Sequence, residues 1–376
     1  MAAFGGKRSL GIDVGSSGVN AVALTLVRKE VQIEKLDTHD TGAEGILNDA
    51  ELYASLGEWL TARKWAKREL VFGLPQFVCT TQVADFPAGS ASGLEDMVSY
   101  ETQQLAGLSE EGFIHDYAVM QALFGRKNPV LIGVCRESVV RERIAAISGA
   151  GVAPAALAMQ GLAAVNALLW LQPEVVEEPT PQILLDLGKE GTTVAVVAAG
   201  QPLYVGSLDF GSYLYTRALA GKMKCDEGEA EIRKHQLDLT QEAPTSAVFQ
   251  VTRKLETELQ YAVEHWRAQE RGELNEVPIS GVWLCGGGAR LGGLSEILES
   301  RLDCPVRLFG PTDSEGGQPM PEHVTAFGLA LAGLGACTHG YFANPCGFSL
   351  ESAARTPVPL SRRRRRLVHA ADGSPC

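Results

Sequence analysis

The sequence lacks the short motifs by which many nucleotide-, metal- and thiol-dependent proteins are recognised. Its 376 residues contain no G-x-x-x-x-G-K-[ST] phosphate loop, and the triple glycine at 286–288 lacks the G-x-G-x-x-G spacing of dinucleotide-binding folds. The eight cysteines form no C-x-x-C pair, and the seven histidines are dispersed without a Ser-His-Asp or Cys-His pattern. We therefore expect no phosphate-loop NTPase, no zinc site of that type, no disulfide framework and no nucleophilic hydrolase.

Positive charge and long membrane-compatible runs are also scarce. The 33 basic residues are outnumbered by 45 acidic ones, and the net charge of −12 gives no electrostatic basis for binding nucleic acid. Residues 151–172 carry no charge over a length that could cross a bilayer, but Pro154, Gln160 and Asn166 lie inside this alanine-rich run. We predict a buried helix there. The first strand starts too soon after Met1 for a signal peptide, which indicates a cytoplasmic protein.

Two segments far apart in the chain share one pattern: an apolar run, an aspartate, a glycine, small hydroxylated residues and a β-branched run. The first contains Asp13, Gly15, Ser16 and Ser17, and the second contains Asp186, Gly188, Thr192 and Thr193. This pattern predicts a strand, a tight turn and a return strand. Glycine lets the backbone N–H groups of such a turn approach a phosphate, and each aspartate is placed to hold a hydrated Mg²⁺.

A third segment follows the apolar residues 281–285 and consists of Gly286, Gly287, Gly288, Ala289 and Arg290. We expect Gly288 to precede a helix, whose N-terminus favours phosphate. The two hairpins and the distal triple glycine together suggest one nucleotide held between two similar halves.

The order and context of these segments resemble the actin-like ATPase superfamily and, within it, the PilM family of type IV pilus assembly. The similarity runs from about residue 8 to about residue 338. LGIDVGSSGVNAVAL resembles the first phosphate motif, VFGLP, FPAGS and YETQQ resemble an inserted subdomain, and LDLGKEGTTVAVVAAGQPLYVGSLDFGSYLYTRALA resembles the second phosphate motif. The resemblance implies an α/β, actin-like ATPase fold with two related halves around a nucleotide cleft and a small α+β subdomain inserted in the first half.

The expected domains follow from this resemblance and from composition. The first-half core covers 8–70 and is completed by 151–172 and 320–338. The inserted subdomain covers 71–150, with strands at 71–74, 77–86, 119–123 and 130–135. The second half covers 182–320, with a helical nucleotide-capping subdomain at about 211–275. Alanine- and glycine-rich helices at 155–170 and 324–335 connect the halves as a hinge, and the Pro/Arg-rich tail at 339–376 is expected to be disordered.

The resemblance also implies ATP and Mg²⁺ as cofactors. Asp13 and Asp186 would hold Mg²⁺ through water, while Gly15, Ser16, Ser17, Gly188, Thr192 and Thr193 line the phosphates. Asn20 departs from the family, which usually has lysine there. Glu231 and Lys234 would contact ribose and adenine, although their spacing also fits a solvated salt bridge on a helix. Gly286, Gly287, Gly288 and Arg290 would close over the adenosine from the other side.

The expected catalytic power is small. Gln160 stands where PilM-like proteins typically carry acidic residues, and a glutamine can orient a water but is no general base at neutral pH. We therefore expect a slow ATPase at most, with ATP acting mainly as a ligand that closes the cleft.

The resemblance implies a scaffold at the inner membrane that binds the N-terminal cytoplasmic peptide of a PilN-like partner, in a groove within about residues 8–150. An FtsA-like polymerising cell-division protein, a type II secretion component and a sugar kinase stay open as alternatives, and self-association is open too. The tail allows two further readings beside disorder: attachment to an anionic membrane, or folding back as an imitation of the partner peptide. Its basic cluster consists of Arg362, Arg363, Arg364, Arg365 and Arg366.

Overall fold

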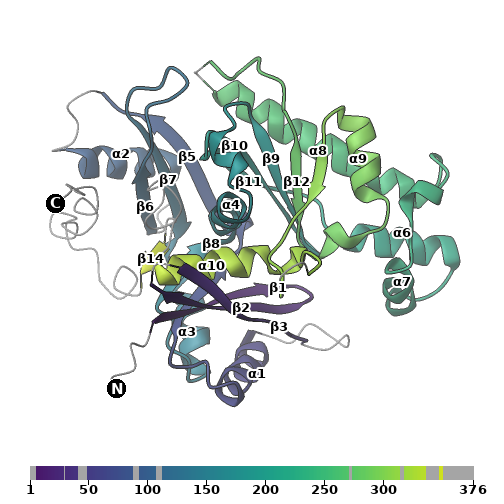
Figure 1. The fold of residues 1–376 in the computed structure, drawn as a ribbon, viewed down its shortest axis with the longest axis horizontal. Helices are drawn as coiled ribbons and strands as arrows, with labels where there is room; N and C mark the ends of the chain where they lie inside the picture. Colours follow the sequence, from purple (N-terminus) through teal and green to yellow (C-terminus); the bar gives the residue numbers. More distant parts are fainter. Residues whose placement is uncertain are drawn as a thin grey trace.

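A computed structural model describes residues 6–28, 30–40, 49–87, 93–106, 112–270, 273–313, 317–335 and 347–349. Its strands form three sheets (Figure 1). A six-stranded sheet lies at one end of the molecule, a five-stranded sheet at the other, and a three-stranded sheet stands beside the first.

The six-stranded sheet has the order β14-β8-β4-β1-β2-β3. Three antiparallel strands from the start of the chain form one side of it: β1 (Lys7–Gly15), β2 (Gly18–Val27) and β3 (Glu30–His39). β4 (Glu69–Leu74) runs parallel to β1, and β8 (Ala156–Met159) runs parallel to β4. Apolar residues are continuous through the middle of β1, β2 and β4 because helices cover both faces of the sheet there.

Those helices come from distant parts of the sequence. α1 (Asp49–Ala62) and α3 (Glu137–Gly149) pack together on one face, while α10 (Val324–Leu334) crosses the other (Figure 1). Tyr53, Leu56 and Leu60 bury the inner side of α1 with at most 1 % exposure. The first half therefore needs residues from both ends of the chain to complete its core.

The three-stranded sheet has the order β5-β7-β6 and carries α2 (Leu94–Ala106). A 3₁₀ turn, η1 (Gln76–Val78), leads into β5 (Cys79–Asp85), followed by β6 (Phe113–Val119) and β7 (Pro129–Arg136). The expected strand at 119–123 is wrong, since the strand ends where it was predicted to begin. The structure also pairs Val71–Phe72 with β1 and β8 and packs α3 on α1, so β4 and α3 belong to the large sheet rather than to the inserted unit.

The five-stranded sheet of the second half has the order β11-β10-β9-β12-β13. β9 (Gln182–Leu187), β10 (Thr192–Ala198) and β11 (Gln201–Leu208) form an antiparallel meander. β12 (Val282–Cys285) and β13 (Val306–Leu308) extend it in parallel from β9. The helices that flank it are α5 (Glu174–Glu177), α6 (Tyr213–Met223), α7 (Glu227–Lys234), α8 (Ala247–Gln269) and α9 (Leu294–Leu302), with 3₁₀ turns η3 (Leu239–Gln241), η4 (Gly287–Arg290) and η5 (Pro321–His323).

Two helices join the halves. α4 (Gln160–Leu171) packs on β9, β10 and β11, while α10 packs on β1, β2 and β4, and the two helices cross each other (Figure 1). The crossing is so close that a Cβ at Gly328 would overlap the carbonyl oxygen of Ala163, and the missing side chain of glycine makes this approach possible. The uncharged run 151–172 is not one helix as expected: its first part forms β8 and only the second part forms α4. Among the described residues, no helix combines the length and apolar character that a membrane crossing demands.

Only three residues of the tail are described. Gly347–Ser349 form β14, which pairs antiparallel with β8. The other tail residues, Arg362–Arg366 among them, lie outside the described part of the chain.

The crossing gives a direct stability test. We expect Gly328→Ala to lower the free energy of unfolding by roughly 1–3 kcal/mol, because the added methyl meets backbone that cannot move aside. Gly221→Ala is the matched control: it lies in α6 and nothing stands within 4 Å of its Cβ position, so its stability should be unchanged or higher by up to about 1 kcal/mol. Urea unfolding of both variants measures the difference. Equal stabilities would contradict the close crossing.

Candidate functional site

Two glycine turns lie at the ends of paired strands. In the first, Gly15 stands opposite Gly18, and Ser16 and Ser17 form an exposed turn between β1 and β2. In the second, the N–H of Gly188 donates to the carbonyl of Gly191 at 3.0 Å, and a Cβ at Gly188 would come within 2.6 Å of that oxygen. Both predicted hairpins are therefore present, with glycine required by the close approach in the second.

An aspartate precedes each turn, and each is held by the start of a connecting helix. The amide Nε2 of Gln160, the first residue of α4, donates to Asp13 Oδ1 at 2.6 Å. The hydroxyl of Thr325, the second residue of α10, donates to Asp186 Oδ2 at 2.6 Å. The two connecting helices thus fix the orientation of both carboxylates.

The pKa values of both carboxylates are raised. The pKa of Asp13 is raised to about 7: burial is the main cause, the negative charge of Asp186 adds to it, and the hydrogen bond from Gln160 opposes both effects. Burial likewise raises the pKa of Asp186 against the hydrogen bond from Thr325. The pKa of the Cys285 thiol is raised by its burial and by both aspartates. The site is therefore a partly desolvated negative centre that lacks a neutralising cation among the described residues around it.

The strands opposite the aspartates carry three further predicted residues. Asn20 faces Asp13 in the register of β1 and β2, and its Oδ1 accepts a hydrogen bond of 3.0 Å from Thr38. Thr193 faces Asp186 on β10. Thr192 is 1 % exposed and its hydroxyl donates to the carbonyl of Phe210 at 2.8 Å, so its side chain braces the sheet and does not face the turn.

Glu231 and Lys234 lie together on α7. Lys234 Nζ lies 2.7 Å from Glu231 Oε1 and donates to the hydroxyl of Thr216 on α6 at 3.0 Å, while Thr216 donates to Glu231. Burial pushes the pKa of Glu231 upward, but the hydrogen bonds from Lys234 and Thr216 outweigh it and lower the pKa. Lys234 is only 9 % exposed, so the alternative of a solvated surface pair does not describe it.

The triple glycine packs directly on the second turn. Gly286 has φ +84°, its N–H donates to the carbonyl of Pro321 at 2.9 Å, and a Cβ there would overlap Asp186 Oδ1. Gly288 is buried against Leu187, while Gly287 is exposed with nothing within 4 Å of its Cβ position. The helix expected after Gly288 is present as α9, but it begins only at Leu294, after the short turn η4 at Gly287–Arg290.

Arg290 is engaged by a partner that the sequence did not indicate. Its Nε and one terminal nitrogen each lie 2.8 Å from a carboxylate oxygen of Glu322. This paired geometry ties the triple-glycine turn to the segment that leads into α10.

Three residues of this region escaped the sequence prediction. Thr325 is separated from Asp186 by 139 positions, and no local pattern marks it. Lys189 follows Gly188 in the second turn, and its charge helps to lower the pKa of Glu231. Gln76 is 3 % exposed, its two amide atoms have no hydrogen-bond partner among the described residues, and its Oε1 would lie 2.6 Å from a Cβ at Gly161. Of these three residues, only Lys189 lies within one of the recognised motifs, the second glycine turn, and could have been identified from the sequence.

The donor set suits a hydrated magnesium ion better than a directly chelated metal. Within the described ranges, no three His, Cys, Asp or Glu side chains gather as a metal cluster would require. Asp13 and Asp186, two carboxylates with raised pKa values, are the oxygen ligands that a cation keeping most of its waters can use.

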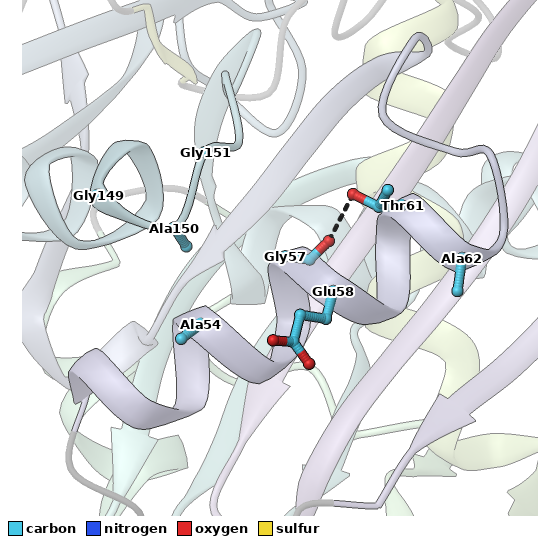
Figure 2. Close-up of a pocket in the computed structure, with 8 residues that line it drawn as sticks. All are labelled: Ala54, Gly57, Glu58, Thr61, Ala62, Gly149, Ala150 and Gly151. Atoms are coloured by element: carbon cyan, nitrogen blue, oxygen red, sulfur yellow. Dashed lines mark hydrogen bonds between the residues drawn. The ribbon is translucent and has the colours of Figure 1, made fainter.

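A separate depression lies between α1 and the end of α3, far from the aspartates. Figure 2 shows it lined mainly by small residues: Ala54, Gly57, Glu58, Thr61, Ala62, Gly149, Ala150 and Gly151. A Cβ at Gly57 would come within 2.5 Å of the carbonyl of Ala150, and the Thr61 hydroxyl donates to the Gly57 carbonyl at 2.9 Å. The small residues are thus explained by close packing of α1 on this turn.

The raised pKa of Asp13 predicts a pH-dependent stability. Between the ordinary aspartate pKa of 3.8 and about 7, the folded chain keeps a proton on Asp13 that the unfolded chain has released, so stability falls as pH rises through this window. We expect Asp13→Asn to raise the free energy of unfolding at pH 8, without divalent cations, by on the order of 2 kcal/mol. Urea unfolding from pH 5 to pH 8 measures it, with the exposed Asp209→Asn as control. Identical pH slopes in wild type and Asp13→Asn would contradict the assignment.

Comparison with known proteins agrees with this architecture. The family model described as type IV pilus assembly protein PilM matches residues 11–333. The solved PilM-PilN type IV pilus biogenesis complex contains a chain 23% identical to this one, with a TM-score of 0.71 over 87% of this chain and 98% of that chain. The ethanolamine utilization protein EutJ from Carboxydothermus hydrogenoformans is 17% identical, with a TM-score of 0.50 over 86% of this chain and 89% of that chain.

These likenesses confirm the predicted α/β, actin-like ATPase fold with its inserted unit. The family match extends over both glycine turns, the triple glycine and nearly all of α10. The chain belongs to the PilM family of type IV pilus assembly proteins.

Proposed function

We propose that this protein is an ATP-binding scaffold of type IV pilus assembly that binds the cytoplasmic N-terminal peptide of a PilN-like inner-membrane protein. The observation that carries the nucleotide part is the pair of carboxylates between two glycine turns, each held by the first turn of a helix joining the halves. The partner part rests on family membership and on the similar fold of the chain in the PilM-PilN complex.

The phosphates would lie against the two turns, with backbone N–H groups and the exposed Ser16 and Ser17 as donors. Asp13 and Asp186 would hold Mg²⁺ through its waters, and the ion would supply the positive charge that the buried pair lacks. Lys189, in the second turn, would provide the cation that Asn20 does not.

The adenosine would lie between α7 and the triple glycine. The buried Lys234 and the carboxylate of Glu231 offer one donor and one acceptor, fixed by Thr216. On the other side, the exposed Gly287 leaves space for a flat ring. Arg290 would act on this wall by holding Glu322 rather than by contacting the nucleotide.

Hydrolysis would be slow. Gln160 already gives its amide nitrogen to Asp13, so its remaining role is to accept a hydrogen bond from a water through Oε1. An amide cannot remove a proton from that water at neutral pH. ATP would therefore act mainly as a ligand whose binding draws the halves together.

The protein would work at the inner face of the inner membrane, held there by its partner. The arginines at 362–366 would add attraction to anionic lipid at about 1 kcal/mol per basic residue near the surface. Membership of the PilM family favours this role over the FtsA-like and sugar-kinase alternatives.

Removal of one carboxylate tests the nucleotide site. We expect Asp186→Asn to weaken Mg-ATP binding at least about tenfold, equivalent to about 1.4 kcal/mol, and to abolish the effect of Mg²⁺ on affinity. Titration with a fluorescent ATP analogue, with Mg²⁺ or with EDTA, measures both quantities. Asp209→Asn keeps the same charge change at an exposed position and should bind as wild type does. Unaltered binding by Asp186→Asn would place the nucleotide elsewhere.

The partner is tested by fluorescence anisotropy with the labelled N-terminal cytoplasmic peptide of the neighbouring PilN-like protein. We expect saturable binding whose affinity changes when Mg-ATP is added, because the nucleotide would change the relation of the two halves. The same peptide with its residues in scrambled order is the control. Normal ATP binding without peptide binding in either state would reject the scaffold role and direct the search to filament formation.

A further inference from the structure

Two cysteines stand opposite each other where the inserted unit joins the rest of the molecule (Figure 1). Cys79 is the first residue of β5, and Cys135 is the last but one residue of β7. The antiparallel register pairs the two residues directly. Such pairs have Cα atoms about 4.5–5.5 Å apart, and a disulfide needs a Cα separation of about 4.4–6.8 Å. The backbone therefore already provides the spacing that a disulfide requires.

Both thiols lie on the face of the three-stranded sheet that is turned to the main core. Along β7, Leu131 and Cys135 pack into this core, and Cys79 packs there too. The alternate residues Ile132 and Val134 pack with α2 in a separate cluster. Cys79 is 9 % exposed and Cys135 is 1 % exposed, and both are present as thiols. The pair is thus enclosed between the inserted unit and the body of the protein.

A hydrogen bond joins the two thiols. The bond from Cys79 is the main cause that holds the pKa of Cys135 below its ordinary value; burial opposes it, and the backbone N–H and the charge of Arg136 support it. The Sγ of Cys135 also lies 3.4 Å from the carbonyl oxygen of Val78. The thiolate is the form of cysteine that attacks an oxidant. Cys135 is therefore the sulfur that reacts first, with Cys79 next to it as the second thiol.

The pair closes the base of the inserted unit. The chain enters the unit through η1, directly before β5, and leaves it at Arg136, directly before α3. η1 and β5 also contact β11 of the second half, where the hydroxyl of Thr81 donates to the carbonyl of Val205 at 2.7 Å. A bond between the two sulfurs would fix both connections at one point and would close residues 79–135 into a loop.

We propose that Cys79 and Cys135 are a reversible redox site, at which hydrogen peroxide converts the two thiols into a disulfide that clamps the base of the inserted unit. The Cys135 thiolate attacks a peroxide oxygen and breaks the O–O bond, which gives a sulfenic acid and, with one proton, a water. The Cys79 sulfur then attacks the sulfenic sulfur and forms the S–S bond, while the leaving hydroxide takes the Cys79 proton as a second water. The thiols lose two electrons and the peroxide gains them, and a dithiol reverses the change by exchange.

Peroxide treatment of the reduced full chain tests the site. Digestion without reductant, followed by mass mapping, should find the peptides of Cys79 and Cys135 joined, and dithiothreitol should separate them. Cys304→Ala is the matched control: burial and the charges of Asp303 and Glu299 raise the pKa of this half-buried thiol, so its removal should leave the yield unchanged. Two intact thiols in the folded chain, joining only in urea, or a bond between two chains would each overturn the proposal.

Urea unfolding measures the clamp. The closed loop of residues 79–135 restricts the unfolded chain, so the unfolding equilibrium constant of oxidised wild type should be at least about tenfold lower than that of reduced wild type. Cys135→Ala should unfold equally with and without peroxide treatment. An unchanged or raised unfolding constant in oxidised wild type would show that the bond strains the sheet, and would overturn the clamp.

Reversibility distinguishes a redox site from oxidative damage. In glutathione buffers of increasing disulfide content, the joined peptide should rise along one two-electron curve, and the same curve should be reached from the oxidised chain. Conversion of Cys135 to sulfinic acid without joined peptide would show damage and would overturn the proposal. These measurements use neither nucleotide nor partner peptide, so their failure leaves the proposed function standing.

Discussion

The close crossing of α4 and α10 is the constraint on which the rest of the molecule depends. Gly328 brings the two helices into backbone contact at Ala163, and Gly11 lets β1 approach α10 just as closely, because a Cβ there would overlap the carbonyl of Ala326. The Ser9 hydroxyl adds a hydrogen bond of 2.6 Å to the carbonyl of Ala330, across 321 positions of sequence. α4 lies on one sheet and α10 on the other, so this contact determines how the halves meet.

The position of the two helix starts explains why the buried carboxylates of Asp13 and Asp186 are tolerated in the candidate site. Gln160 and Thr325 stand at the starts of the crossing helices, and each gives a hydrogen bond to one aspartate. Neutral donors can orient a carboxylate but cannot remove its charge, so burial still raises the pKa values of both aspartates, and the charge of Asp186 adds to the effect on Asp13. A cation bound there, as proposed, would relieve this cost and would couple its binding to the way the halves meet.

Elements that form within a short segment could be predicted from the sequence. Elements and residue roles that depend on contacts between distant segments could not. The two glycine turns were found because aspartate, glycine and β-branched residues stand in a fixed order. β8 was taken as helix because residues 155–159 are apolar and alanine-rich like the helix that follows them, and only pairing with β4 and β14 makes 156–159 a strand. β6 was placed too late, and Thr325 was not found, since its role depends on a partner 139 positions away.

The segment before α10 connects the candidate site to the first half through further hydrogen bonds and an ion pair. The 3₁₀ turn η5 receives the Gly286 N–H at Pro321, and Glu322 holds Arg290 of the triple-glycine turn. The next residue, His323, is 1 % exposed and contacts the carbonyl of Asp37 on β3 through Nε2 at 3.2 Å. Burial lowers the pKa of His323 and keeps its ring neutral at physiological pH, although Glu322 opposes this effect. The ion pair of Arg290 with Glu322 and the contact of His323 with Asp37 thus connect the triple-glycine turn to β3, at the far side of the sheet from β8.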